Sequence, residues 1–257
     1  MLPPLPPRII PCLLLQNEAF VKTIKFKTPV YIGDPVNTIN LFNKFEVDEI
    51  MVLDIGCSRN GTKPNFSLIE DLASECWVPL AYGGGIQSVE DAKKILNSGI
   101  EKILVESLLF SNPQEVQRCV DEFGSSSVVG CINVKTNLLG QYELRTQSNH
   151  KKASLSFDAT IDLLKEIKIG EIVINHISRD GTHKGYDLNL IKKITQKVDC
   201  PVVALGGASG LKDFKKAIDA GASAVSAGSY FVFQRKSSTS ILINYPPRKE
   251  IESLFHD

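Results

Sequence analysis

Paired cysteines, an excess of charge and long apolar runs are all missing from this sequence of 257 residues. The six cysteines stand far apart and form no CxxC pair, so a disulfide framework or a zinc site is not expected. Lys plus Arg and Asp plus Glu both number 29, so the formal net charge is zero and a general nucleic-acid surface is not indicated. No apolar run approaches the ~20 residues that cross a bilayer, and the opening MLPPLPPR is too short and proline-rich for a signal peptide. We therefore expect a soluble, cytoplasmic protein that needs no metal or other cofactor and binds neither nucleic acid nor membrane.

What the sequence does contain is a regular alternation of apolar, strand-like runs with amphipathic helical stretches. The expected strands are 8–15, 49–55, 78–83, 102–107, 127–134, 171–177, 201–207 and 223–228. The expected helices are 35–45, 66–76, 88–99, 113–124, 156–168, 188–198 and 211–221. Eight β-then-α units in this length predict a closed (β/α)8 TIM barrel. A doubly wound open sheet is the alternative, but the glycine-rich turns do not match GxGxxG.

The chain also repeats itself. Residues 78–110 resemble residues 200–233, and Pro79, Gly84 and Ser107 match residues that each lie 122 positions later (for example, 201 − 79). A constant offset of about half the chain predicts one barrel domain built from two homologous half-barrels, about 1–124 and 125–257.

Glycine-rich turns follow the third, seventh and eighth expected strands. Their bare backbone N–H groups can hold a phosphate at the carboxyl end of the barrel, although a tight turn without a ligand is the plainer interpretation. Because the turns recur in both halves, we favour a phosphate site in each half. The loop 178–187, SRDGTHKGYD, is expected to close over a ligand, whereas His176 is expected to be a packed, hydrogen-bonded residue.

Four charged residues stand where expected strands begin, and strand starts meet at the bottom mouth of a barrel. These residues are Arg8, Glu49, Lys102 and Glu171. Buried charges persist only when paired, so two cations and two anions are expected to form a ring there. Such a ring either plugs the barrel floor or gates the passage of a small neutral molecule, and the sequence alone favours neither.

The opposite mouth lacks an acid–base pair. If Arg8 points into the barrel, so does Leu14 on the same strand, and Asn133 takes the corresponding place on the fifth strand. An asparagine offers hydrogen bonds but no proton exchange near neutral pH, and a leucine offers neither.

The order RIIPCL, DEIMVLDI, PLAYGGGI, EKILVES, VVGCINVK, GEIVINHISRDGTHKGYD, ALGGASG and AGSYFVF resembles the cyclase subunit of imidazole glycerol phosphate synthase from end to end. That family receives ammonia from a glutaminase subunit at the barrel bottom and closes an imidazole ring on a bis-phosphate ribonucleotide at the top. The resemblance assigns the ammonia gate to the four charged residues above. It assigns phosphate binding to Gly85, Ser107, Gly181, Gly207, Gly228 and Ser229.

The sequence departs from the family at several of its functional positions. The two catalytic aspartates of the family fall on Leu14 and Asn133, and its strand-six acid falls on Ser178, while Asp180 is kept. Glu106 replaces a family asparagine, and a carboxylate close to a phosphate repels it.

The stretches PCLLL, FVFQ and ILINYP are similar to a paralogue of the cyclase from surface-polysaccharide pathways, which accompanies a glutaminase and a sugar amidotransferase. The resemblance implies a barrel subunit that conducts ammonia to that amidotransferase and keeps a site for a phosphorylated ligand. One alternative is a genuine cyclase, a lyase of histidine biosynthesis, in which Asp54 and Asp180 take over proton transfer. A phosphosugar isomerase of the same barrel type is a further alternative that also needs an acid–base pair.

Overall fold

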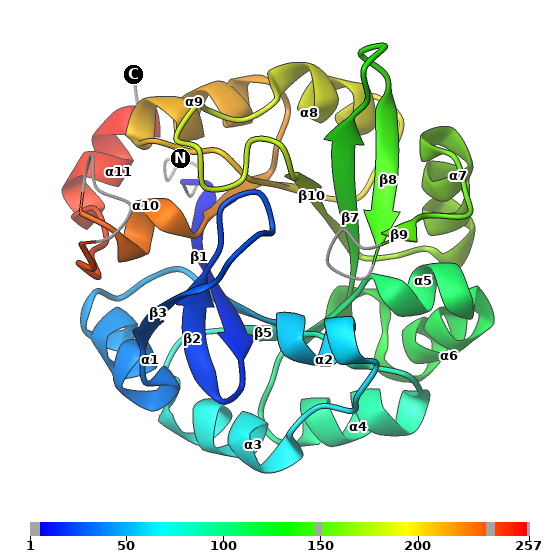
Figure 1. Ribbon diagram of the computed structural model, residues 1–257, viewed down its shortest axis with the longest axis horizontal. Helices are drawn as coiled ribbons and strands as arrows, with labels where there is room; N and C mark the ends of the chain where they lie inside the picture. The colour runs from blue at the N-terminus through cyan, green and yellow to red at the C-terminus, as the bar shows by residue number, and fades with distance from the viewer. Residues whose placement is uncertain (1–5, 147–150, 235–239, 256–257) are drawn as a thin grey trace, which may run out of the picture.

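The computed structural model describes residues 6–146, 151–234 and 240–255 and contains a closed barrel of eight parallel strands (Figure 1). The strands are β1 (Arg8–Gln16), β4 (Ile50–Asp54), β5 (Leu80–Gly83), β6 (Lys102–Val105), β7 (Val128–Thr136), β10 (Glu171–His176), β11 (Val202–Leu205) and β12 (Ala224–Ala227). Strand β1 pairs with both β12 and β4, and the pairing of β7 with β10 closes the circle. The predicted (β/α)8 barrel is confirmed.

Helices surround the barrel and follow the predicted order. The longer ones are α1 (Pro35–Lys44), α3 (Phe66–Glu75), α4 (Val89–Asn97), α6 (Pro113–Phe123), α7 (Phe157–Ile167), α8 (Leu188–Thr195), α9 (Leu211–Asp219) and α11 (Arg248–Phe255). Local sequence sets their starts, because Asp34, Ser88 and Asn112 each accept a hydrogen bond from the backbone N–H three residues later. No helix within the described ranges is both long and apolar enough to cross a bilayer.

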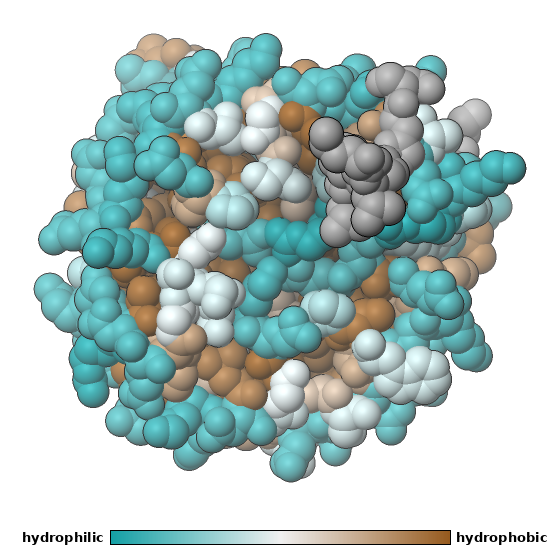
Figure 2. All heavy atoms as spheres, turned by 180° about the vertical axis from the view of Figure 1, so that it is seen from behind, coloured by the Kyte–Doolittle hydropathy of each residue, from teal (hydrophilic) through white to brown (hydrophobic). Residues whose placement is uncertain are grey.

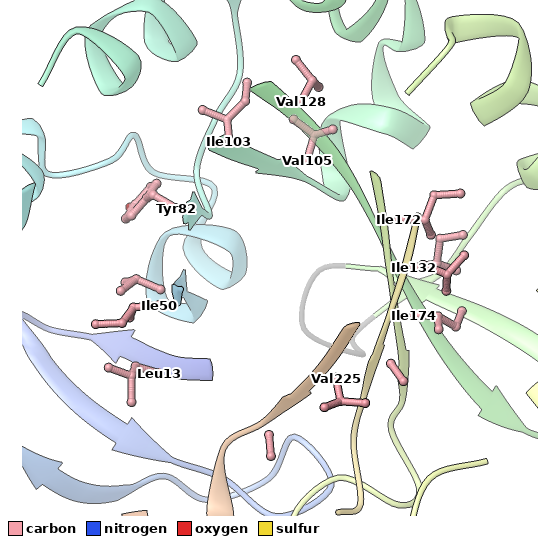
Figure 3. Close-up of a cluster of buried hydrophobic side chains, with 14 of the residues drawn as sticks. Leu13, Ile50, Tyr82, Ile103, Val105, Val128, Ile132, Ile172, Ile174 and Val225 are labelled. Atoms are coloured by element: carbon pink, nitrogen blue, oxygen red, sulfur yellow. The ribbon is translucent and has the colours of Figure 1, made fainter. Parts of the chain in front are cut away.

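The core consists of two layers separated by the barrel strands. Alternate strand residues such as Leu13, Ile132 and Ile172 face outward and pack under the helices (Figure 3). Their neighbours in sequence, Ile10 and Cys131 among them, fill a smaller cluster inside the barrel. Because side chains alternate across a strand, this register also sends Arg8, Cys12 and Leu14 to the inner face of β1, as predicted.

Two hairpins extend the barrel at its carboxyl end and were not predicted. Strand β1 continues into β2 (Ala19–Lys22) and β3 (Val30–Gly33), and β7 continues into β8 (Tyr142–Thr146) and β9 (Lys151–Lys152). Three short helices, α2 (Ile55–Asn60), α5 (Ser107–Ser111) and α10 (Ser229–Val232), begin directly after strands β4, β6 and β12 or one residue later. These additions surround the mouth of the barrel where the strands end.

Candidate functional site

A cavity of about 100 Å³ opens at the carboxyl ends of the barrel strands. Its lining includes Leu14 and Asn133, which occupy the positions singled out in the sequence, and three carboxylates, Asp54, Glu106 and Asp180. Active sites of (β/α)8 barrels are built at this end, so the cavity is the candidate ligand site.

Leu14 and Asn133 face this cavity but bring no proton donor or acceptor that titrates near neutral pH. Leu14 packs with Leu53 against the apolar cluster inside the barrel. Asn133 is 9% exposed, and its side-chain oxygen accepts a hydrogen bond from Asn175 Nδ2 at 3.3 Å. The Asn133–Asn175 pair can orient a ligand by hydrogen bonding, but it cannot serve as a general acid or base.

Asp54 is engaged in structural hydrogen bonds. It caps α2, because its Oδ1 accepts from the backbone N–H of Cys57 at 2.9 Å. Its Oδ2 accepts from the Cys57 thiol at 3.2 Å and from the Tyr82 hydroxyl at 3.4 Å. Burial, aided by the negative charge of Asp54, raises the pKa of Cys57 to about 11, so the thiol stays protonated and keeps donating to this carboxylate.

Asp180 is paired with Lys22, a residue that the sequence reading did not single out. Lys22 Nζ lies 3.1 Å and 3.2 Å from the two carboxylate oxygens of Asp180 and donates to the backbone carbonyl of Thr23 at 2.6 Å. The Lys22 side chain is 4% exposed, so the pair is buried. It joins the β2–β3 hairpin to the loop after β10, and the backbone N–H of Lys25 adds a hydrogen bond to the carbonyl of Asp180.

The predicted phosphate-binding residues are only partly gathered at the cavity. Among the residues that the structure describes, the cavity lining includes Gly85, Ser107 and Gly228. It does not include Gly181, Gly207 or Ser229. Backbone conformation and close packing are enough to explain why glycine stands at positions 85 and 207. Gly85 has a φ of +72° and Gly207 a φ of +109°, and a Cβ at these positions would lie 2.7 Å and 2.4 Å, respectively, from a backbone carbonyl oxygen. Phosphate binding at these turns therefore stays a prediction.

His176 is buried and hydrogen-bonded, as the sequence predicted. It is 5% exposed, and its Nε2 lies 2.9 Å from the hydroxyl of Thr136. Burial lowers its pKa more than the nearby carboxylate of Asp187 raises it, so the ring is neutral at physiological pH.

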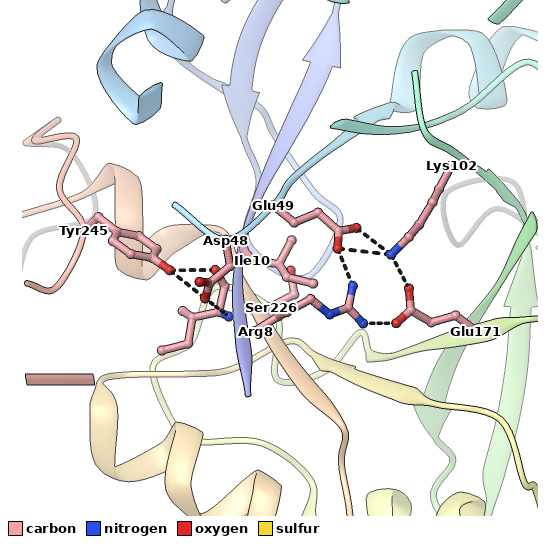
Figure 4. A network of polar contacts seen from close by, with 9 residues as sticks. Arg8, Ile10, Asp48, Glu49, Lys102, Glu171, Ser226 and Tyr245 are labelled. Carbon is pink, nitrogen blue, oxygen red and sulfur yellow. Dashed lines mark hydrogen bonds and ion pairs between the residues drawn. The ribbon is translucent and has the colours of Figure 1, made fainter. Parts of the chain in front are cut away.

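At the amino ends of the strands, the four predicted charges form a closed ring (Figure 4). We call Arg8, Glu49, Lys102 and Glu171 the charge ring. Arg8 donates one hydrogen bond to each glutamate, and Lys102 Nζ lies 3.1 Å from Glu49 Oε2 and 3.1 Å from Glu171 Oε2. Each cation thus contacts both anions.

The charge ring is largely buried, which distinguishes it from the ion pairs on the surface of the protein. The side chains of Glu49 and Glu171 are 4% and 9% exposed, and those of Lys102 and Arg8 are 21% and 33% exposed. Burial alone lowers the pKa of Arg8, but the hydrogen bonds and charges of the two glutamates outweigh it and raise that pKa. The guanidinium of Arg8 therefore stays charged between the two glutamates.

Apolar side chains separate the charge ring from the cavity. On β1 the order from the ring upward is Arg8, Ile10, Cys12 and Leu14. Cys12 and Cys131 belong both to the interior cluster and to the cavity lining. The barrel axis thus runs from the charge ring through an apolar layer into a cavity lined by both apolar and charged side chains.

Comparisons with known proteins agree with this architecture. A family model described as "Histidine biosynthesis protein" matches residues 8–237. "Putative imidazole glycerol phosphate synthase subunit HisF" of Leptospira interrogans is 46% identical over 257 residues, covering 98% of this chain and all of the relative. "Putative imidazole glycerol phosphate synthase subunit hisF2" of Pseudomonas aeruginosa is 41% identical, covering 95% of this chain and 98% of the relative.

A further relative carries the same subunit name without a number. "Imidazole glycerol phosphate synthase subunit HisF" of Alkaliphilus metalliredigens is 36% identical over 231 residues, which cover 90% of this chain and 92% of the relative. Both the family match and these identities extend over nearly the whole barrel. The chain belongs to the histidine biosynthesis protein family, among relatives named as the HisF subunit of imidazole glycerol phosphate synthase.

Proposed function

We propose that this chain is the barrel subunit of a glutamine-dependent complex and conducts ammonia from a glutaminase to a sugar amidotransferase of polysaccharide biosynthesis. The glutaminase docks at the bottom of the barrel, beside the charge ring. Ammonia released there passes the ring, crosses the apolar layer and leaves at the top. The relatives named as synthase subunits support a partner subunit. The resemblance of PCLLL, FVFQ and ILINYP to the polysaccharide paralogue supports the acceptor.

One observation carries the proposal: the charge ring is complete, while Leu14 and Asn133 occupy the two places where acid–base chemistry is expected. General acid–base catalysis typically contributes about 10²–10⁴-fold to a rate, so a chain without the pair is a poor cyclase. Burying a ring of four charges costs desolvation free energy, and apolar side chains could close the barrel floor without that cost. A role in ammonia passage therefore accounts for the charges better than a role as a plug.

The chemistry of the barrel axis suits a neutral molecule. Ammonium would have to leave water and enter the apolar layer around Ile10 and Met51, which is unfavourable for an isolated charge. Ammonia carries no such penalty. Lys102 is the mobile member of the ring in this scheme, because its flexible stem can swing aside while Arg8 stays bound to both glutamates.

The bottom face also offers apolar surface for a partner. Trp77 precedes β5 and is 79% exposed, and Phe45 at the end of α1 is 39% exposed. Both lie among the connections that lead into strand starts. Figure 2 views the molecule from behind Figure 1 and shows apolar surface between hydrophilic side chains on this face. Exposed aromatic residues commonly anchor protein interfaces.

The test uses the purified chain together with its glutaminase. We expect glutamine hydrolysis to rise when the barrel subunit is added. We expect Lys102→Met to uncouple that hydrolysis from transfer of ammonia to the acceptor enzyme, while external ammonium salt still supports the acceptor. A glutaminase that neither binds the barrel nor responds to it would refute the proposal.

A genuine cyclase of histidine biosynthesis is the second candidate. It is favoured by the three carboxylates that line the cavity, Asp54, Glu106 and Asp180, and by the names of the relatives. Asp54 and Asp180 are, however, bound to Cys57 and Lys22, respectively. Proton transfer by either would first have to release these contacts, so we rank the cyclase second.

A further inference from the structure

The turns after β6 and β12 are equivalent in the sequence repeat but differ at one residue. Ser107 and Ser229 correspond, and the residues before them are Glu106 and Gly228. The two preceding residues share one backbone conformation, with φ −126° and ψ −69° at Glu106 and φ −103° and ψ −71° at Gly228. Both line the cavity. The same backbone frame thus places a carboxylate on one side of the cavity and bare backbone on the other.

On the β6 side, the carboxylate occupies the serine. The hydroxyl of Ser107 donates to Glu106 Oε2 at 2.7 Å. The charge of Glu106 also reaches the barrel interior: burial raises the pKa of Cys131, and the Glu106 carboxylate raises it further. A phosphate placed here would meet a like charge and a hydroxyl that already has an acceptor.

On the β12 side, Gly228 brings no carboxylate to the corresponding position. Ser229 is 5% exposed, and its hydroxyl has no hydrogen-bond partner among the residues that the structure describes. The stem of Lys22 lies over Gly228, since a Cβ on that glycine would come within 2.8 Å of Lys22 Cε. This side of the cavity therefore combines bare backbone, a buried unpartnered hydroxyl nearby and an adjacent ammonium group that is shared with Asp180.

We propose that the cavity selects a ligand with a single phosphate group, bound on the Gly228 side, and that Glu106 accepts hydrogen bonds from a hydroxyl or amino group at the opposite end of the ligand. A bis-phosphate ligand is rejected because its second phosphate would face Glu106. The inference refines the proposed function, since it assigns a chemical class to the phosphorylated ligand that the barrel subunit would recognise.

The experiment is a titration of the isotope-labelled full chain with inorganic phosphate, followed by amide chemical shifts. We expect saturable shifts at Gly228 and Ser229 and none at Ser107 and Leu108. Ser229→Ala should weaken this binding at least threefold. Ser74→Ala is the control, because the Ser74 hydroxyl donates to the backbone carbonyl of Asp71 on the exposed surface of α3, and we expect it to leave phosphate binding unchanged.

The variant Glu106→Gln removes the charge and keeps the shape of the side chain. We expect a second saturable set of shifts to appear at Ser107. We also expect the affinity for fructose 1,6-bisphosphate, relative to that for fructose 6-phosphate, to rise about tenfold, because the variant removes a like charge close to the second phosphate. A wild-type chain that binds phosphate at both turns, binds none, or prefers the bisphosphate would overturn the inference.

These results separate the inference from the proposed function. Binding is measured on the barrel alone and needs neither glutaminase nor acceptor. If phosphate binds at Gly228 but the glutaminase ignores the barrel, only the proposed function fails. If the glutaminase responds but phosphate binds at both turns, only the ligand inference fails.

Discussion

At the scale of the residue, the charge ring shows how burial decides what a charge contributes. Glu49 and Glu171 are each held by both Arg8 and Lys102, so neither carboxylate is left alone in the barrel floor. Replacing a whole buried ion network by apolar residues often leaves the stability of a protein unchanged, whereas removing one member leaves its partners as buried charges without a counterion. Single substitutions in the ring should therefore be destabilising.

We predict that Lys102→Met lowers the free energy of unfolding by about 1–3 kcal/mol, because two nearly buried carboxylates then share one guanidinium. Urea unfolding measures the loss. Lys93→Met is the control: Lys93 pairs with Glu122 at 3.0 Å on the surface, and its loss should cost less than about 0.5 kcal/mol. Equal effects of the two variants would show that the ring is no more than a surface network.

The second residue-scale prediction concerns Leu14 and Asn133. If the barrel acts by conducting ammonia, Leu14→Asp combined with Asn133→Asp should leave glutaminase stimulation within about twofold of wild type, because acid–base chemistry at the cavity has no part in that step. Glutamate release from glutamine measures stimulation. A requirement for, or a large gain from, the two aspartates would contradict an ammonia-conducting role.

At the scale of the element, two segments that are distant in sequence hold the ends of the barrel. The β2–β3 hairpin is tied to the loop after β10 through Lys22 and Asp180. At the bottom, the hydroxyl of Tyr245 donates to the carbonyl of Ile9 at 2.9 Å and lies 3.3 Å from Asp48 Oδ2 (Figure 4). Both ties fix β1, which carries Arg8 at one end and Leu14 near the other.

We predict that Lys22→Met loosens the β2–β3 hairpin, because Asp180 becomes an unpaired buried carboxylate. Amide hydrogen exchange at Lys25, whose N–H donates to the Asp180 carbonyl, should become at least tenfold faster. The double variant Lys22→Met with Asp180→Leu should recover much of the protection. Unchanged exchange at Lys25 in the single variant would show that backbone pairing alone holds the hairpin.

Tyr245→Phe removes one hydroxyl and should cost about 1 kcal/mol of unfolding free energy, since the carbonyl of Ile9 loses a partly buried donor. Tyr31→Phe, at a side chain that is 59% exposed, is the matched control and should be neutral. Thermal unfolding of both variants and of the wild type measures the two losses of stability. A neutral Tyr245→Phe would mean that the carboxyl-terminal segment does not stabilise β1 through this contact.

The sequence predicts the barrel well because each barrel strand is an apolar run that can be recognised without its neighbours. Alternation of Leu13 and Leu15 with Cys12 and Leu14 places one set under the helices and the other inside the barrel. The hairpins were missed because β2, β3 and β8 have only four or five residues each, too few for a clear alternating pattern, and their place is set by pairing with β1, β2 and β7, respectively.

The candidate site could be predicted only in part, for a similar reason. The charge ring follows from strand starts, which a sequence reveals. The Lys22–Asp180 pair joins residues 158 positions apart, and the bond between Ser107 and Glu106 depends on a rotamer. Local periodicity predicts neither long-range pairing nor the rotamer of a side chain, so these contacts required the structure.

At the scale of the whole molecule, the two mouths of the barrel differ in chemistry. The bottom has the charge ring with exposed aromatic surface nearby, and the top has a cavity lined by apolar side chains and three carboxylates. A complex that delivers ammonia needs this polarity, because the donor and the acceptor must occupy opposite ends.

We predict that Trp77→Ala weakens binding of the glutaminase by at least tenfold, as expected for an exposed aromatic anchor at a protein interface. Leu139→Ala is the control, because Leu139 is 83% exposed but lies in the connection between β7 and β8 at the opposite mouth. Calorimetric titration with the glutaminase measures both. Equal affinities of Trp77→Ala and wild type would place the partner elsewhere.

The most direct test of the central claim is to supply the purified chain with the ribonucleotide substrate of the cyclase and an ammonium salt, and to measure imidazole formation. The account predicts no product above the level without protein, because Leu14 and Asn133 provide neither a general acid nor a general base. Imidazole formation at the rate of an ordinary cyclase would contradict it.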